Sequence, residues 1–245
     1  GLTLGGADAA NYTVVAAAGL TADITPRPLS ASGVTVAPKV YDGTDTATLD
    51  GAATLAVLAG DQVTFAGSLV ARFADRNVGT GKAVTVTGFG LGGPDAANYR
   101  LDGLGVLTGT ITPRPVSVQG LTVASKVYDG TAVAALSGAP TLNILGGDQV
   151  SLSGTVQAAF PDKNVGANRP VTLSGVALQG ADAGNYSLVP PAGLQASITP
   201  RPLALTGLAA ASRTYDGTDI APLTGNATIT PLPGDTVSVA GAAVG

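Results

Sequence analysis

The sequence predicts an all-β protein, a tandem array of immunoglobulin-like β-sandwich units. Three observations lead to this prediction: an internal period of 87 residues, a composition dominated by Gly, Ala, Thr and Val, and turn residues that separate short β-rich segments. No segment has the apolar spacing of an amphipathic helix. An array of β-grasp-like units is the alternative reading of the same pattern.

The period is clearest in a Tyr-Asp-Gly-Thr motif that occurs three times. Its tyrosines, Tyr41, Tyr128 and Tyr215, are 87 residues apart. An Asp-Ala-Ala/Gly-Asn-Tyr motif, an Ile-Thr-Pro-Arg-Pro motif and a Gly-Asp-Gln/Thr-Val motif recur with the same step. The chain therefore aligns to itself without a gap. This alignment predicts the C-terminal part of one repeat (1–27), two full repeats (28–114 and 115–201) and the N-terminal part of a fourth (202–245). We expect the chain to be a piece of a longer array.

Each Tyr-Asp-Gly motif is predicted to form a tight structural turn. Glycine adopts positive φ without steric cost, and an Asp side chain can accept hydrogen bonds from the backbone just downstream. The preceding tyrosine is expected to bury its ring and to pair its hydroxyl. The structural residues predicted on this basis are Tyr41, Asp42, Gly43, Tyr128, Asp129, Gly130, Tyr215, Asp216 and Gly217.

The Asn-Tyr motif predicts a corner in each repeat, ending at Tyr99 and at Tyr186. In the first copy, Asp95, Ala97, Tyr99 and the apolar Leu101 occupy every second position. That spacing is similar to the corner before strand F of immunoglobulin domains, where a Tyr hydroxyl bonds back to the chain. The alternative is a single helical turn capped by Asp95. Both tyrosines are expected to be buried, with their hydroxyls bonded to backbone.

Within the second full repeat, short β-rich segments alternate with clusters of Gly, Asp, Asn and Pro. The predicted strands are residues 116–124, 132–137, 141–145, 150–154, 156–160, 170–174, 186–189 and 194–198. This density of short strands is typical of a β-sandwich.

The composition excludes several function classes. The chain has no His, Cys, Met or Trp, and all of its 16 acidic residues are Asp. Catalysis by Ser/His/Asp or Cys/His, and zinc sites built on thiolate or imidazole, are therefore excluded. The sequence predicts no catalytic residue, no cofactor-binding residue and no enzyme. The net charge of −4 disfavours a nucleic-acid partner, and the longest apolar run, residues 14–20, is too short for membrane insertion.

Two pairs of carboxylates are candidate calcium ligands, namely Asp42 with Asp45 and Asp216 with Asp219. In the middle copy the second position is Ala132, so a site would be missing there. Turn chemistry explains the same residues more simply. A Lys–Asn isopeptide crosslink is disfavoured, because Lys39 and Lys126 are matched by Arg213.

The connection between repeats is predicted to be stiff. Ile111-Thr112-Pro113-Arg114-Pro115 contains no flexible Gly/Ser run, and its prolines restrict the backbone of the segment. We expect adjacent repeats to contact each other through a small interface at this segment and to form a rod.

Taken together, the Tyr-Asp-Gly-Thr motif, the Asp-Lys-Asn-Val-Gly run at 162–166, the Asn-Tyr corner and the Ile-Thr-Pro-Arg-Pro junction resemble the YDG-type repeats of large bacterial surface proteins similar to filamentous haemagglutinin. The resemblance covers essentially the whole chain and provides no catalytic residues. It implies an extracellular location on the surface of a Gram-negative bacterium, which the protein reaches by two-partner secretion.

Three function classes are compatible with this resemblance. The first is a stalk or spacer of an adhesin, which projects a distal adhesive region and has adjacent repeats as its partners. The second is a module that itself binds a ligand on a host or neighbouring cell. The third is a fibre that self-associates outside the cell. The six tyrosines all belong to the two structural motifs, which disfavours an aromatic carbohydrate platform.

Overall fold

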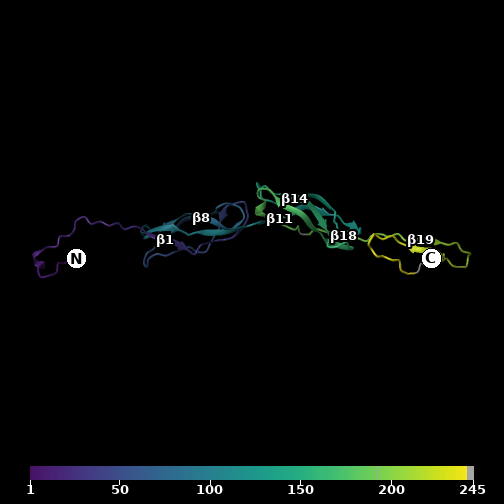
Figure 1. Ribbon diagram of the computed structural model, residues 1–245, viewed down its shortest axis with the longest axis horizontal. Coiled ribbons are helices and arrows are strands. Elements are labelled where there is room, and N and C mark those ends of the chain that lie inside the picture. The colour runs from purple at the N-terminus through teal and green to yellow at the C-terminus, as the bar shows by residue number, and fades with distance from the viewer. Residues whose placement is uncertain (192, 242–245) are drawn as a thin grey trace. The chain divides into compact units, whose positions relative to one another are not determined.

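The computed structural model describes residues 1–191 and 193–241, and its regular elements are β-strands with three short 3-10 turns (Figure 1). The all-β prediction is confirmed, and the strand arrangement is β-sandwich-like. The three 3-10 turns are η1 (Ala9–Asn11), η2 (Ala96–Asn98) and η3 (Ala183–Asn185). None of the helical segments in the described residues is long and apolar enough to cross a membrane. The last four residues of the predicted repeat 202–245 lie outside the described residues.

The chain divides into two compact units. The first contains Gly1–Pro38, Asp45–Asp75 and Gly81–Gly109, and the second contains Lys39–Thr44, Arg76–Thr80 and the chain from Thr110 onward. The division does not coincide with the repeat boundaries, because two short segments of the first full repeat belong to the second unit.

The first full repeat contributes ten strands. In chain order they are β1 (Arg27–Ser32), β2 (Thr35–Val36), β3 (Lys39–Val40), β4 (Thr46–Ala47), β5 (Leu49–Asp50), β6 (Thr54–Leu55), β7 (Thr64–Phe73), β8 (Gly79–Gly92), β9 (Tyr99–Gly103) and β10 (Leu107–Thr112). Within the first unit, β7 pairs antiparallel with both β8 and β4, while β1 pairs antiparallel with β6 and parallel with β9. In the second unit, β3 runs parallel to the end of β10, with Lys39 opposite Ile111.

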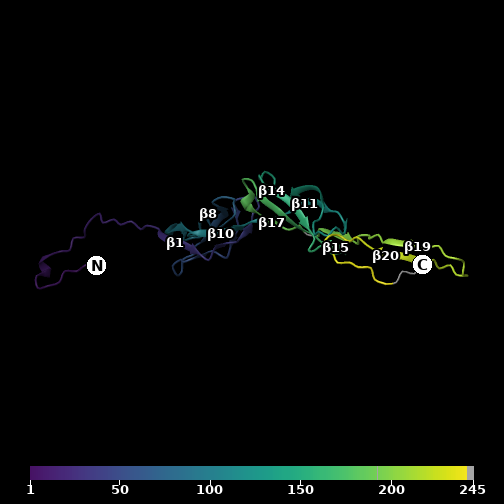
Figure 2. The same cartoon turned by 45° about the vertical axis from the view of Figure 1, so that its right-hand side comes forward.

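Among the described residues, the second full repeat contributes eight strands and the chain after it two more. They are β11 (Arg114–Val123), β12 (Lys126–Val127), β13 (Leu136–Leu142), β14 (Ser151–Ala159), β15 (Gly166–Pro170), β16 (Thr172–Gln179), β17 (Tyr186–Val189), β18 (Gln195–Thr199), β19 (Thr206–Ala210) and β20 (Leu223–Thr228). Figure 2 labels several of them, among them β19 and β20. The antiparallel pairs are β11–β13, β14–β16, β15–β18 and β19–β20, and the parallel pairs are β11–β17 and β12–β18.

Several predicted strands merge or shift in the structure. Residues 150–154 and 156–160 form the single strand β14, whose register shifts between Gly154 and Gln157. Gly154 has φ +84°, and a Cβ there would collide with the carbonyl oxygen of Gly175. The glycine therefore allows an irregularity within a continuous strand, where the sequence pattern indicated a break. The strand predicted at residues 132–137 also lies at a different position, since β13 begins at Leu136.

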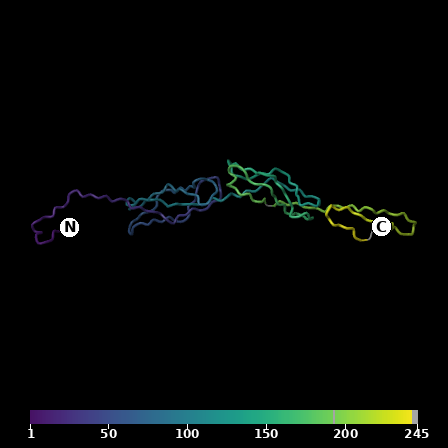
Figure 3. The backbone as a smooth tube through the Cα atoms, in the orientation of Figure 1, coloured from purple at the N-terminus to yellow at the C-terminus, as the bar shows by residue number. Residues whose placement is uncertain are grey.

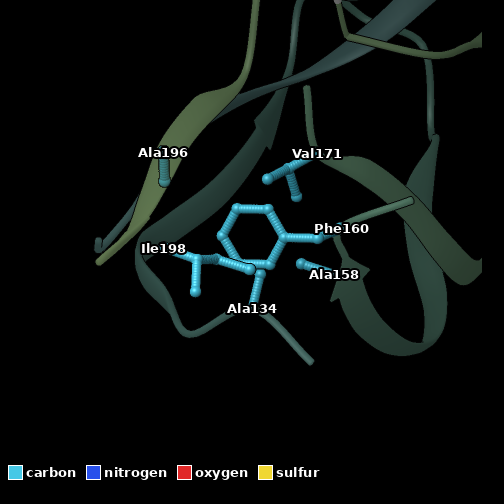
Figure 4. Packing of buried hydrophobic residues seen from close by; sticks show 6 residues of the cluster. All are labelled: Ala134, Ala158, Phe160, Val171, Ala196 and Ile198. Atoms are coloured by element: carbon cyan, nitrogen blue, oxygen red, sulfur yellow. The ribbon is translucent and has the colours of Figure 1, made fainter. Parts of the chain in front are cut away.

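The core of the second repeat surrounds the ring of Phe160. Figure 4 shows this ring among Ala134, Ala158, Val171 and Ile198, all of which are buried. Val171 follows β15 and Ile198 lies on β18, so the cluster joins segments far apart in the sequence. In the first repeat the equivalent Phe73 and Val84 are also buried. Burial of one phenylalanine ring in each full repeat gives each of them its own small core.

The segment before Arg27 has η1 as its only regular element among the described residues, and Figure 3 draws it in purple as a single trace with a loop. Many of its apolar side chains are exposed, among them Leu2, Leu20 and Ile24. This segment therefore keeps a local turn without a packed core around it.

Candidate functional site: the Tyr-Asp-Gly joint

The Tyr-Asp-Gly-Thr motif folds as a closed turn around one carboxylate. In the middle copy, Asp129 Oδ1 accepts hydrogen bonds from the Thr131 backbone N–H (2.9 Å), the Thr131 hydroxyl (2.9 Å) and Lys126 Nζ (2.8 Å). These bonds, that from Lys126 first, lower the pKa of Asp129 to about 2. Gly130 has φ +83° between Asp129 and Thr131, a conformation that glycine adopts freely.

The other two copies repeat this geometry. Asp42 binds the Thr44 N–H (2.9 Å) and Lys39 (2.8 Å), while Asp216 binds the Thr218 N–H (3.0 Å) and Arg213. Gly43 has φ +80° and Gly217 has φ +83°, so the predicted positive φ is confirmed at all three glycines. Arg213 replaces lysine and keeps the ion pair.

Three of the four candidate calcium ligands are paired with cationic side chains. Asp42 pairs with Lys39, Asp216 with Arg213, and Asp45 with Arg72 at 2.6 Å. Asp219 is exposed. In the described part of the chain no three acidic side chains gather closely enough to hold a metal ion. A calcium ion at either pair would therefore compete with the chain's own cations.

The tyrosine of the first motif has a long-range partner. Tyr41 is fully buried, and its hydroxyl donates to Asp148 Oδ2 at 2.9 Å. The Tyr186 hydroxyl donates to the same oxygen at 2.7 Å, and the two rings meet edge to face with centroids 5.6 Å apart. All three residues lie in the second unit. A single carboxylate thus links the Tyr-Asp-Gly turn of one repeat to the Asn-Tyr corner of the next.

A cation completes the arrangement. Arg76 places one guanidinium nitrogen 3.1 Å from Asp148 Oδ1 and the other 2.9 Å from Asp182 Oδ1. The Asp148 side chain is only 1% exposed, whereas Arg76 is 42% exposed. A buried carboxylate needs such partners, because an unpaired charge in this position would be strongly destabilising. We call Tyr41, Arg76, Asp148 and Tyr186 the first joint.

A buried asparagine supports the joint at its side. Asn185 accepts the backbone N–H of Val78 at 2.9 Å and donates from Nδ2 to Asn77 Oδ1 at 3.1 Å. Asn185 directly precedes Tyr186, so the same corner contacts both the Tyr-Asp-Gly turn and the segment after Arg76. Polar groups on both sides of the contact are therefore satisfied.

The protonation behaviour follows from burial and these bonds. Burial, followed by the hydrogen bond to Asp148, raises the pKa of Tyr41 to about 12. Burial also raises the pKa of Tyr186. Burial by itself raises the pKa of Asp148. The hydrogen bonds from Tyr186 and Tyr41 and the charge of Arg76 outweigh this effect, so the pKa of Asp148 lies below its ordinary value. The joint is thus held as a carboxylate with two protonated phenols.

A second joint, formed by Tyr128, Lys163 and Asp235, repeats the arrangement 87 residues on. Tyr128 donates to Asp235 Oδ1 at 2.9 Å, and Lys163 Nζ lies 2.7 Å from the same oxygen. The Lys163 ammonium also lies over the Tyr128 ring, 5.7 Å from its centroid, within cation–π range. The hydrogen bond to Asp235 raises the pKa of Lys163, and Lys163 lowers the pKa of Asp235. The cation differs between the two joints while the Tyr–Asp contact is kept.

A family model described as the YDG domain matches residues 25–105 and 112–193, which together are more than half of the chain. The chain belongs to the YDG domain family. No curated protein and no solved structure gives a significant match. Each matched stretch begins inside an Ile-Thr-Pro-Arg-Pro motif and contains one Tyr-Asp-Gly turn and one Asn-Tyr corner, so both parts of the joint belong to the YDG repeat itself.

The tyrosines that were predicted to be structural differ in how deeply they are buried. Tyr41, Tyr99 and Tyr186 are buried and Tyr128 is partly buried, as predicted for rings in a core, whereas Tyr215 is 89% exposed. The predicted bond between hydroxyl and backbone is present at Tyr99 and Tyr186, whose hydroxyl oxygens accept the N–H of Leu58 and of Leu145. As donors, the four hydroxyls of Tyr41, Tyr99, Tyr128 and Tyr186 have a different partner. They donate to aspartate side chains, since a carboxylate is the stronger acceptor in a buried position.

The predicted immunoglobulin-type corner differs in its partner. Tyr99 follows the 3-10 turn η2, whose Asp95 makes no side-chain capping bond. The Tyr99 hydroxyl donates to Asp61 at 2.6 Å and accepts the N–H of Leu58 at 3.0 Å, far upstream in the YDG repeat. Sequence reasoning missed the role of Asp61, Asp148 and Asp235. Their recurrence at 87 residues, in step with the tyrosines, was the signal that could have found it.

Proposed function

We propose that these YDG repeats form part of the stalk of a bacterial cell-surface adhesin, where they act as a spacer that projects a distal adhesive region. The observation that carries the proposal is the repeated joint. Tyr41 contacts Asp148 and Tyr128 contacts Asp235 over the same separation of 107 residues. A contact that recurs with the 87-residue period joins neighbouring repeats of an array. In repeat proteins, such contacts between neighbours contribute to the stability of the whole array.

The backbone connection supports the same proposal. β10 ends at Thr112 and β11 begins at Arg114, so Pro113 alone separates them. Proline fixes φ and restricts the residue before it. A one-residue connection and a side-chain cluster centred on a buried carboxylate together oppose bending, and stiffness and length are the properties that a spacer needs.

The proposed location is the extracellular face of a Gram-negative cell, reached by two-partner secretion. Membership of the YDG domain family and the order of the four motifs support this location. The absence of His and Cys from the sequence is consistent with a role that depends on length and not on catalysis.

The test removes one whole repeat from the parent adhesin. Deletion of residues 115–201 keeps the period, so that Tyr41 then faces Asp235 in place of Asp148. We expect the shortened protein to reach the surface and to mediate adhesion as before, with the adhesive region nearer to the cell. Immunogold distances from the cell surface measure the reach. Loss of adhesion by a folded, surface-exposed deletion variant would contradict the spacer function and would indicate that the deleted repeat binds the ligand.

A further inference from the structure

Five aspartates are followed directly by glycine, namely Asp42, Asp50, Asp102, Asp129 and Asp216. The backbone between Asp and Gly is prone to isomerisation, because glycine has no side chain that would hinder an attack by its own nitrogen. In this reaction the glycine nitrogen attacks the aspartate Cγ and closes a five-membered succinimide ring. The rate depends on whether the local structure holds the two atoms together.

The Asp-Gly pairs of the three Tyr-Asp-Gly turns are held away from this attack. Asp129 Oδ1 accepts the N–H and the hydroxyl of Thr131, two residues further on, and the ammonium of Lys126. The carboxylate is thus directed past the glycine. The bond from Lys126 contributes most to the low pKa of Asp129, about 2, and an ionised carboxylate lacks the proton with which its oxygen leaves as water. The same turn geometry holds Asp42 and Asp216.

The pair Asp50-Gly51 has a different geometry. The Gly51 N–H donates a hydrogen bond of 2.8 Å to Oδ1 of Asp50 itself. Because Oδ1 is bonded to Cγ, this contact holds the attacking nitrogen beside the carbon with which it reacts. Asp50 is exposed, so water reaches the site, and among the described residues no cation forms an ion pair with it.

The fifth pair, Asp102-Gly103, is intermediate. Asp102 is exposed, but its Oδ1 lies 3.1 Å from Nε of Arg100, which draws the carboxylate toward a cation. Gly103 is also held in the ladder between β9 and β1, where it pairs with Ser30. We therefore expect Asp102 to react more slowly than Asp50.

We propose that Asp50 is a site of spontaneous isomerisation in the folded chain. The Gly51 nitrogen forms a bond to Cγ of Asp50 as a Cγ–O bond breaks, and the oxygen leaves as water with the proton of the Gly51 N–H and the proton of the neutral carboxyl group. Water then adds to the succinimide. If it opens the ring at the α-carbonyl carbon, the product is isoaspartate, whose main chain runs through Cγ; opening at Cγ restores aspartate. The water released equals the water consumed, and no enzyme or cofactor takes part.

Isomerisation lengthens the backbone where the structure leaves no room. Gly51 has φ +86°, and a Cβ added there would lie 2.3 Å from the carbonyl oxygen of Gly33. Asp50 pairs with Thr35 between β5 and β2. Isoaspartate inserts a methylene into the main chain at this pair, so the register between the two strands is lost. This inference is independent of the stalk proposal, since it concerns the chemical ageing of a single repeat.

The second full repeat contains the same turn without the reactive residue. Ser137-Gly138 is the counterpart of Asp50-Gly51. Gly138 has φ +94°, and a Cβ there would lie close to the carbonyl oxygen of Gly120, as at the first turn. Serine has no carboxyl carbon, so this turn provides a matched control within the chain.

The test is incubation of the folded full chain at neutral pH, followed by proteolysis and electron-transfer fragmentation, which distinguishes isoaspartate from aspartate at each position. We expect isoaspartate to accumulate at Asp50 at least about tenfold faster than at Asp129. In urea, which unfolds the chain, the rates at the five pairs are expected to converge. Equal rates in the folded chain, or a faster reaction at Asp102 or Asp129, would overturn the proposal. So would an advantage of Asp50 that persists in urea, since the flanking sequence would then decide the rate.

Two variants exchange the residues of the equivalent turns. Asp50→Ser is expected to abolish the product in its turn, and Ser137→Asp is expected to form isoaspartate at a rate similar to that of Asp50. A folded Ser137→Asp chain that forms no isoaspartate at that position would contradict the role of the turn geometry.

Hydrogen exchange measures the structural consequence. The Ala37 N–H donates to the Thr48 carbonyl at 3.0 Å, beside the pair formed by Asp50. After ageing, exchange at Ala37 is expected to become faster in the unchanged chain and to stay slow in Asp50→Ser. Equal exchange in the two aged chains would show that isomerisation leaves the strand register intact and would overturn this part of the proposal.

Discussion

The Tyr41 hydroxyl donates a 2.9 Å hydrogen bond to the carboxylate of Asp148, which lies 107 residues further along the chain. Tyr128 and Asp235 form the same bond at the same distance and the same separation. In each joint the acceptor carboxylate also receives a cation, so the strength of the joint depends on charge as well as on packing. Asp148 is the residue on which the first joint depends most.

Asp148→Ala is expected to destabilise the chain. It removes the acceptor for Tyr41 and Tyr186 and leaves Arg76 without one of its two partners. Removing one member of a buried ion pair typically costs about 3–5 kcal/mol in the free energy of unfolding. Chemical denaturation of the full chain measures the loss.

The matched control for this variant is Asp61→Ala, since Asp61 binds a corner tyrosine in the same way. In the described chain, Tyr99 is the one tyrosine that donates to Asp61, so we expect a smaller loss than at Asp148. Equal losses at the two positions would mean that the Tyr41 contact contributes nothing.

The raised pKa of Tyr41 predicts a loss of stability in alkali. The pKa is about 12 in the folded chain and about 10 when unfolded, so folding favours the protonated phenol. This contribution is fully present below pH 10 and is lost as the pH rises from about 10 to about 12. Denaturation midpoints of the unchanged chain and of Tyr41→Phe, measured from pH 9 to pH 12, test this. The midpoint should fall less steeply in Tyr41→Phe; parallel curves would exclude Tyr41 as the titrating group.

Gly130 is expected to tolerate substitution poorly because its backbone has a positive φ, and not because an added side chain would lack space. A Cβ there would lie 3.5 Å from Leu232 Cδ1, an ordinary contact, but φ is +83°. A left-handed conformation costs an L-residue about 1–2 kcal/mol, and more for a β-branched side chain. Gly130→Ala should therefore lower the free energy of unfolding by about this amount and Gly130→Val by more. Gly146→Ala, at a glycine without positive φ and with open space around its Cβ, is the control and should change little. Equal effects at the two glycines would argue against backbone strain.

Local chemistry could be predicted from the sequence, and long-range pairing could not. The Tyr-Asp-Gly turn, the positive φ of Gly43 and the strand β17 follow from turn propensities and short periodic patterns, which act over a few residues. In the sequence Asp148 is visible only as part of the recurring Gly-Asp-Gln/Thr-Val motif, because nothing in its neighbourhood indicates a partner 107 residues away.

The partner of the cation in each joint is not evident from the sequence for a related reason. Arg76 and Lys163 each lie between an Asp and an Asn, and the motif resembles a local charge pair. In the structure both cations bind a carboxylate of the following repeat. The shared period of tyrosine, cation and aspartate indicated the contact, but one sequence does not say which copy pairs with which.

The joint is predicted to make the connection between consecutive repeats stiff. Pulsed electron spin resonance between nitroxides at Ser68→Cys and Thr155→Cys tests it most directly, because the two exposed positions are equivalent in consecutive repeats and the chain has no other cysteine. The unchanged joint is predicted to give one narrow distance distribution, and Asp148→Ala, with Pro113 and Pro115 intact, a much broader one. A broad distribution with the joint intact, or the same narrow one without Asp148, would show that the joint does not stiffen the connection.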